Sequence, residues 1–242
     1  MGTQARTADL DRRRAIARAL VRRNKEEDLI LRGYVCEDKY WVAGPLYWPW
    51  NCTETFDNHW LQKGLDGPYH TFPRLPYLPW LFSRMVTEPI LFIPKSREMM
   101  VSWSVMAFAV WLCQMFERTH VLVQSQKLEK AEELVKGREP PGYSRTLWER
   151  QPQWLKDRHP LATRLDDLPA DRMAWANGSA IQAVGKGADQ VRMYHPTLFI
   201  MDEAAHLDEA EASFGAAIPV CKRIIVVSSA GPGWFASICS PD

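Results

Sequence analysis

Leu198-Phe199-Ile200-Met201-Asp202-Glu203 is a run of four apolar residues that ends in two acids. A short apolar run without alternation is typical of a strand that is buried on both faces of a parallel sheet. The runs 90–93 and 224–227 have the same character, and further strands are predicted at 120–124 and 180–184. We therefore expect several short strands, of which the one at 198–201 carries acidic side chains at its carboxyl end.

Helical stretches are predicted between these strands, at 101–116 and 128–136. Strands that alternate with helices predict an α/β fold with a mainly parallel sheet flanked by helices. The apolar run 99–116 approaches the length of a transmembrane helix. We interpret it instead as a helix at the centre of the domain, because it contains Ser102 and Gln114 and because a central helix can be apolar on all sides.

The composition constrains the domains and the partners. Residues 1–70 are predicted to form an N-terminal lobe, helical at first and then irregular and aromatic-rich, and residues 71–242 the sheet domain. Arginines at 12–23 suit either a contact with DNA or a neighbouring subunit, or a solvated helix face. The net charge of +1 gives no overall attraction to nucleic acid. Five cysteines without a C-x-x-C pair argue against a disulfide framework or zinc site and fit a reducing cytosol.

The acid pair is the first candidate site. Open α/β sheets bind ligands at the carboxyl ends of their strands, where Asp202 and Glu203 are predicted to lie. We expect Asp202 to hold Mg²⁺ through water and Glu203 to polarise an attacking water molecule. The alternative is a strand end with two solvated acids.

A second candidate lies between the strand predicted at 90–93 and the helix that follows it. Backbone N–H groups at a helix start can face phosphates, and a triphosphate site also needs a cation and a hydroxyl for Mg²⁺. Lys95 and Arg97 supply the cation and Ser102 the hydroxyl, although the standard phosphate-loop glycines are missing. The alternative is a structural basic turn. The residues predicted to bind phosphate are Lys95, Ser96, Arg97, Glu98, Met99, Met100, Val101 and Ser102.

A third candidate is the hydroxyl pair Ser228-Ser229, at the end of the strand predicted at 224–227. In nucleotide-driven motors this place senses the γ-phosphate and couples hydrolysis to movement; alone, the pair before Gly-Pro-Gly is a turn. A phosphate loop, an acidic strand and a polar strand end follow one another, and the strand at 120–124 falls between the first two in sequence. This order predicts a P-loop ATPase of the additional-strand class.

These residues resemble the large terminase subunit of tailed bacteriophages. The loop 96–102 is similar to its variant phosphate loop Ser-Arg-x-x-Gly-Lys-[Ser/Thr], with Lys95 in the place of a relocated lysine, and departs from it at Met100 and Val101. The segments 121–135, 177–181 and 189–196 also resemble the family. The resemblance implies that Arg192 reaches a neighbouring subunit's ATP. The alternative is that Arg192 forms a salt bridge to Asp189 or another surface acid. Tyr77 occupies the place where adenine is held, and either stacks on the base or packs in the core.

The resemblance further implies ATP and Mg²⁺ as cofactors and a motor that drives double-stranded DNA into a procapsid in the host cell cytoplasm. It implies a homo-oligomeric ring, with the portal protein and the small terminase subunit as partners. Because nothing after Ser240 is long enough for the family's C-terminal nuclease, we expect no nuclease activity in this chain. Two alternatives stay open: a helicase-like ATPase stimulated by nucleic acid, and a non-catalytic structural module with a decayed nucleotide site.

Overall fold

The structure is a computed structural model that describes residues 72, 75–151 and 153–240. The predicted lobe at 1–70, including its arginine cluster, lies outside the described residues.

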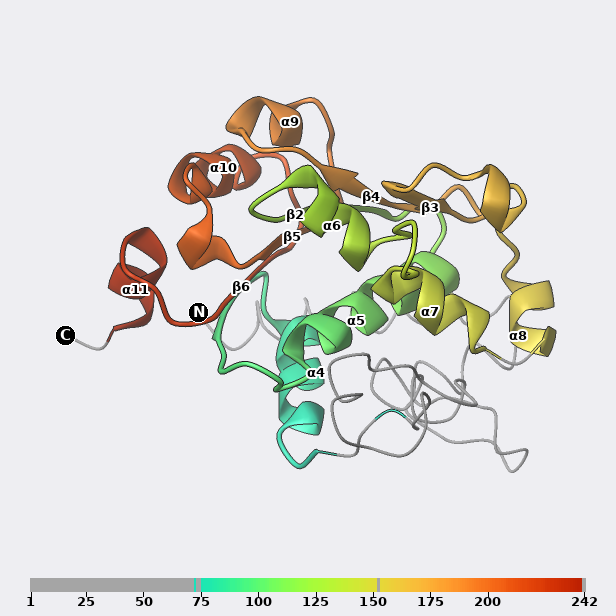
Figure 1. Ribbon diagram of the computed structural model, residues 1–242, viewed down its shortest axis with the longest axis horizontal. Helices are drawn as coiled ribbons and strands as arrows, with labels where there is room; N and C mark the ends of the chain where they lie inside the picture. The colour runs from blue at the N-terminus through green and yellow to red at the C-terminus, as the bar shows by residue number, and fades with distance from the viewer. Residues whose placement is uncertain (1–71, 73–74, 152, 241–242) are drawn as a thin grey trace, which may run out of the picture.

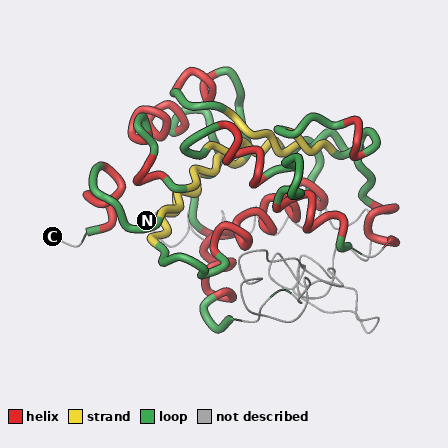
Figure 2. The backbone as a smooth tube through the Cα atoms, viewed as in Figure 1, coloured by secondary structure: helices red, strands yellow, loops and turns green. Residues whose placement is uncertain are grey.

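The described residues form a six-stranded sheet with the spatial order β1-β6-β5-β2-β4-β3 (Figures 1 and 2). All neighbouring strands are parallel except β3 and β4, which are antiparallel. The predicted α/β fold with a mainly parallel sheet is therefore confirmed. The strands are β1 Ile90–Pro94, β2 His120–Gln124, β3 Arg172–Ala174, β4 Ala180–Val184, β5 Leu198–Asp202 and β6 Ile224–Ser228.

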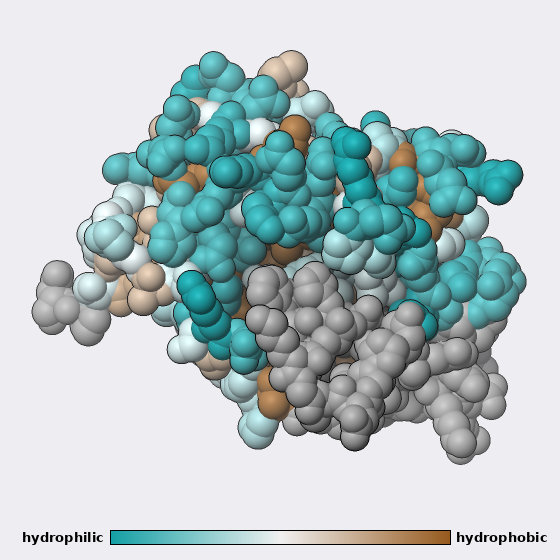
Figure 3. Space-filling view, in the orientation of Figure 1, coloured by the Kyte–Doolittle hydropathy of each residue, from teal (hydrophilic) through white to brown (hydrophobic). Residues whose placement is uncertain are grey.

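Helices cover both faces of the sheet, which explains why the inner strands show no apolar–polar alternation. One face packs against α4, α5, α6 and α7, and the other against α9, α10 and α11 (Figure 1). The helices are α4 Leu78–Thr87, α5 Val101–Met115, α6 Leu128–Leu134, α7 Tyr143–Glu149, α8 Gln153–Arg158, α9 Ala188–Arg192, α10 Ala210–Ala217 and α11 Trp234–Cys239, with short 3₁₀ helices η1 Leu165–Asp167 and η2 Ala204–His206. The face seen in Figure 3 is mainly hydrophilic over α6, α9 and α10, because the apolar side chains of these helices point into the two cores.

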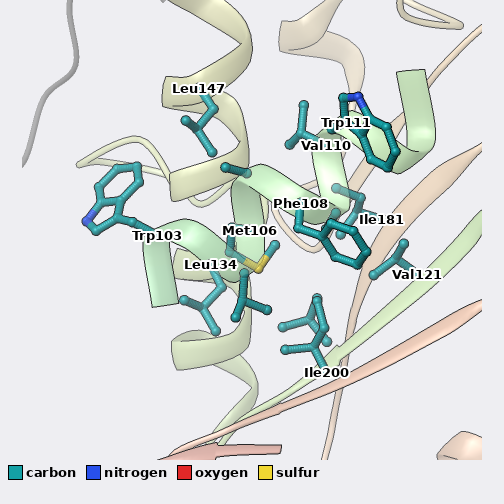
Figure 4. Packing of buried hydrophobic residues seen from close by; sticks show 14 of the residues in the cluster. Trp103, Met106, Phe108, Val110, Trp111, Val121, Leu134, Leu147, Ile181 and Ile200 are labelled. Atoms are coloured by element: carbon teal, nitrogen blue, oxygen red, sulfur yellow. The ribbon is translucent and has the colours of Figure 1, made fainter. Parts of the chain in front are cut away.

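The apolar run interpreted as a central helix is α5, which lies between the sheet and α7. Met106, Phe108 and Val110 are buried among residues of the sheet and of the neighbouring helices (Figure 4). Within the described part of the chain, no helix is long and apolar enough to cross a membrane. The position of α5 is decided by packing on all sides, and its first turn faces the carboxyl edge of the sheet.

The order of the strands brings three strand ends together. The strand between β1 and β5 in space is β6, whereas β2, which lies between them in sequence, is on the other side of β5. Pro94 is in register with Ser228, and Asp202 with Val227. The strand inserted between β1 and the acidic strand β5 is thus β6 and not the strand at 120–124, as the order along the sequence had predicted, and the polar ends of β1, β6 and β5 share one edge.

The carboxyl end of α5 is held by buried amides. Gln114 Nε2 donates to Gln151 Oε1 at 2.7 Å and Gln151 Nε2 donates to Gln114 Oε1 at 2.9 Å. Asn177 Nδ2 donates to the carbonyl oxygen of Cys113 at 2.8 Å. These bonds satisfy polar groups that the apolar surroundings would otherwise leave without partners.

This reciprocal pair gives a stability prediction. Gln114→Met should lower the free energy of unfolding by about 1–3 kcal/mol, because it leaves the buried Gln151 amide without its partner. The double variant Gln114→Met/Gln151→Met should recover most of the loss, because no polar group then stays unpaired. Chemical denaturation of the four proteins measures this. A double variant as unstable as the sum of the two single changes would contradict the prediction.

Candidate active site

A cavity of about 620 Å³ lies at the sheet edge where β1, β5 and β6 end, beside the first turn of α5. It gathers residues from five parts of the sequence, namely 95–103, 125–134, 143, 202–206 and 229. The predicted site residues that line it are Lys95, Ser96, Arg97, Glu98, Met99, Met100, Val101, Ser102, Asp202, Glu203 and Ser229.

An ion pair joins the loop after β1 to the residue that follows the acidic strand β5. Lys95 Nζ lies 2.9 Å from Glu203 Oε1, and the Lys95 side chain is only 10 % exposed. The backbone N–H of Lys95 donates to the carbonyl oxygen of Ser228 at 2.9 Å, which continues the pairing of β1 with β6. The lysine is therefore fixed at both its backbone and its ammonium group, directly over the acid pair.

A second hydrogen bond links α5 to the acidic strand. Ser102 Oγ donates to Asp202 Oδ1 at 2.9 Å. Burial and the neighbouring charge of Glu203 raise the pKa of Asp202 to about 6, despite the opposing effects of Lys95 and Ser102. A carboxylate that is buried with incomplete compensation at neutral pH is a favourable place for a cation.

Glu203 is held through both of its carboxylate oxygens. Oε1 accepts from Lys95, and Oε2 accepts from Ser229 Oγ at 2.8 Å. Burial alone raises the pKa of Glu203, but the hydrogen bonds from Lys95 and Ser229 outweigh it, so the pKa lies below its usual value. Glu203 also has a left-handed backbone with φ of 55°, which turns the chain sharply from β5 into η2.

The loop between β1 and α5 takes left-handed backbone conformations without glycine. Glu98 has φ of 62° and Met100 has φ of 54°, and Met100 is the residue that stands where the variant phosphate loop has glycine. Such a conformation costs a non-glycine residue about 1–2 kcal/mol. At Met100 it is held by the buried side chain and by the carbonyl oxygen, which accepts from both N–H and Oγ of Ser104. The loop thus takes left-handed backbone conformations at two positions that hold no glycine.

Three predicted residues are not among those lining the cavity. Tyr77 packs against the core and donates its hydroxyl to the carbonyl oxygen of Met99, so it supports the loop from behind. Ser228 is buried, and its hydroxyl accepts from the backbone N–H of Ala205 at 3.0 Å. Arg192 is exposed on α9 and lies 3.2 Å from Asp189. Tyr77 is half-buried and does not line the cavity, and its stacking on a base stays a prediction.

Two parts of the site were not predicted. His206, on η2, lines the cavity and lies 3.3 Å from Ser229 Oγ. The far wall comes from the end of β2, from α6 and from α7, where Tyr143 stacks on Trp103 with ring centroids 3.8 Å apart. A histidine three residues after an acid pair is a signal that the sequence does contain, whereas the approach of α7 depends on packing alone.

The donor set fits a magnesium ion held together with a nucleotide. Mg²⁺ prefers hard oxygen ligands and usually takes one or two protein carboxylates, with water and phosphate completing its shell. The Ser102 hydroxyl and the Asp202 carboxylate are adjacent oxygen ligands of this kind. Among the described residues there is no cluster of three or more histidine, cysteine or acidic side chains that would hold a metal by itself.

The raised pKa of Asp202 predicts that the free energy of unfolding depends on pH when no metal is bound. The pKa is about 6 in the folded chain against an ordinary value of 3.8, so between these values the folded chain binds more protons than the unfolded one. The free energy of unfolding therefore falls as the pH rises from about 4 to about 6. Asp202→Asn should raise it by up to about 3 kcal/mol at pH 7.5 and very little near pH 4.

Denaturation in the presence of a chelator at both pH values measures this difference. Asp208→Asn is the control, because Asp208 is an exposed acid paired with Lys186, whose charge lowers the pKa of Asp208. A stabilisation by Asp202→Asn that is equally large at pH 4 would contradict the assigned cause.

Comparison with known proteins gives similarities among solved structures only. No family model and no curated protein matches the chain. The ATPase domain of the large terminase of Thermus phage P74-26 is 14 % identical, with 69 % of each chain covered and a TM-score of 0.45. A variant of that domain is 13 % identical with the same coverage and TM-score. The large terminase of a thermophilic bacteriophage, solved in complex with ADP, is 12 % identical over 60 % of this chain and 34 % of its own, with a TM-score of 0.37.

Proposed function

We propose that this chain is a magnesium-dependent ATPase. The observation that carries the proposal is the meeting of a phosphate-loop lysine, two acids and a serine hydroxyl at one sheet edge: Lys95 on Glu203, and Ser102 on Asp202. These four groups have the chemistry that hydrolysis of a phosphoanhydride needs, namely a cation for the phosphates, ligands for Mg²⁺ and a base for water.

The phosphates would bind at the start of α5. The first backbone N–H groups of a helix have no partners within the helix, and the helix dipole favours an anion there. The loop that precedes α5 lines the cavity together with Lys95 and Arg97. A cavity of about 620 Å³ is in the range of small-molecule sites.

Nucleotide binding would release the base. Without nucleotide, the Lys95 ammonium group pairs with Glu203 Oε1, which keeps this carboxylate weakly basic. The β- and γ-phosphates would compete for the same ammonium group and carry more negative charge than the glutamate. When Lys95 moves to the phosphates, Oε1 becomes free to accept a proton from water.

The chemical step then follows from these positions. Glu203 Oε1 takes a proton from water as the water oxygen forms a bond to the γ-phosphorus. The bond from this phosphorus to the β,γ-bridging oxygen breaks, and its electron pair leaves with ADP. Ser102 and Asp202 would hold Mg²⁺, which neutralises phosphate charge when it is bound.

We further propose that hydrolysis drives double-stranded DNA into a procapsid, in a homo-oligomeric ring with the portal protein and the small terminase subunit in the host cytoplasm. The resemblance of the loop, the acidic strand and the segments between them supports this role. In such a ring Arg192 would reach the ATP of a neighbour. Its exposed position on α9, away from the lining of its own cavity, is compatible with that contact.

The structural-module alternative is less well supported by the geometry. A decayed site has no reason to keep a lysine with 10 % exposure on the acid pair or to keep two strained residues in its loop. Hydrolysis that is stimulated by single-stranded but not duplex DNA would favour the helicase-like alternative.

Glu203→Gln tests the assigned base. The change removes the proton acceptor but keeps the shape of the side chain, so we expect the hydrolysis rate to fall by about 100-fold or more. The affinity for MgATP should not fall, because Glu203 is not assigned to phosphate binding and the glutamine competes less with the phosphates for Lys95. Glu133→Gln is the matched control, since Glu133 also lines the cavity but pairs with Lys130. Equal rates for wild type and Glu203→Gln would refute the assignment.

Lys95→Met tests the assigned phosphate cation. Loss of a charge-assisted hydrogen bond to phosphate should raise the Kd for MgATP by about 10- to 100-fold. Calorimetric titration is the measurement, with Lys130→Met as the control because Lys130 lines the cavity but is exposed and paired with Glu133. Arg97→Met should weaken binding less, because Arg97 is exposed. A larger effect for Arg97→Met would transfer the role of phosphate cation to the arginine.

A further inference from the structure

His206 makes two polar approaches within the cavity. Its Nε2 atom lies 3.3 Å from Ser229 Oγ and 4.0 Å from Glu203 Oε2. It stands on η2, directly after the sharp turn at Glu203, whereas Ser229 follows β6. The imidazole therefore connects the acidic strand to the loop that begins at the end of β6.

The hydrogen bonds in this group have one consistent direction. The single hydroxyl hydrogen of Ser229 goes to Glu203 Oε2 at 2.8 Å. Ser229 Oγ is then left with lone pairs only, so it accepts from the Nε2–H of His206. This order assigns the tautomer and gives a chain in which His206 donates to Ser229 and Ser229 donates to Glu203.

The imidazole ring also lies close to the backbone of Gly231. A Cβ atom on Gly231 would lie 3.1 Å from Cε1 of His206 and 3.0 Å from Cβ of Ala205. The absence of a side chain at Gly231 thus leaves the space that the ring occupies. The bond from the Ala205 N–H to Ser228 Oγ at 3.0 Å fixes the distance between η2 and β6.

We propose that His206 is a positioning residue for ATP hydrolysis, acting on Glu203 through Ser229; this inference rests on the ATPase function proposed above. His206 keeps the Ser229 hydroxyl directed at Oε2 of Glu203. The other carboxylate oxygen, Oε1, accepts a hydrogen bond from Lys95 Nζ. With Oε2 held, departure of Lys95 exposes Oε1 alone, in a fixed orientation toward the γ-phosphate.

The test compares single-turnover hydrolysis rates with MgATP affinities in three variants of this chain. His206→Phe keeps the ring but removes the donor, and should lower the rate by about tenfold while the Kd for ATP changes by less than about twofold. His206→Gln restores an N–H donor and should recover most of the rate. His195→Gln, at an exposed histidine outside the cavity lining, is the control. A rate for His206→Phe equal to that of the wild type would overturn the proposal.

A double-mutant cycle tests the route through Ser229. If His206 acts only through this hydroxyl, His206→Phe should slow Ser229→Ala no further. If the two losses multiply in the double variant, the proposed route is wrong. Gly231→Ala is an independent change, because its methyl group would press on Cε1 of His206 and on Cβ of Ala205 and shift the imidazole by a few tenths of an ångström, so it should lower the rate, but by less than His206→Phe. Gly215→Ala is its control, since a Cβ there meets nothing within 4 Å.

Hydrolysis by the wild type distinguishes a wrong role for His206 from a wrong ATPase assignment. Absence of hydrolysis in the wild type, at the level of Glu203→Gln, would remove the ATPase assignment. An active wild type whose rate is unaffected by both His206→Phe and Gly231→Ala would remove only the role of His206. Thermal unfolding of each variant shows whether it folds, and the Gln and Gly231 variants keep the test decisive if the Phe variant does not.

Discussion

The ion pair between Lys95 and Glu203 joins parts of the chain that are 108 residues apart, and the other contacts of the site are arranged around it. The largely buried ammonium group of Lys95 lies against Glu203, and beside this pair the buried Asp202 accepts from Ser102. The two acids respond in opposite directions: the pKa of Asp202 is raised and that of Glu203 is lowered. This asymmetry supports the different roles proposed for the two acids: the charge of Asp202 is incompletely compensated, which favours a cation, whereas Glu203 is held by Lys95.

The sheet makes this arrangement possible. Because β6 lies between β1 and β5, its end places Ser228 and Ser229 beside the strand ends that carry the lysine and the acids. The same insertion provides the hydroxyl that holds Glu203 from behind. The helices on both faces keep the strand ends rigid, and α5 brings Ser102 to Asp202 at the point where its first turn begins.

In the loop between β1 and α5, residues other than glycine adopt the left-handed backbone conformation that glycine favours. Met100 adopts the left-handed conformation because burial of its side chain and two hydrogen bonds to its carbonyl oxygen compensate the steric cost. Tyr77 adds a third support through the carbonyl oxygen of Met99. A search for glycines alone therefore underestimates such a loop, and the position of the lysine before it is the more useful signal.

Local sequence determined the α/β class, the five predicted strands and the residue types at their ends, because apolar runs and the polar residues that follow them are properties of neighbours in the chain. It also identified Lys95, Ser102, Asp202 and Glu203. Only the tertiary structure decided which strands adjoin, that Ser229 rather than Ser228 faces the acids, that Tyr77 packs behind the loop, and that His206 and α7 complete the cavity. These outcomes depend on register, on strand order and on the packing of helices from distant parts of the chain, none of which a local pattern encodes.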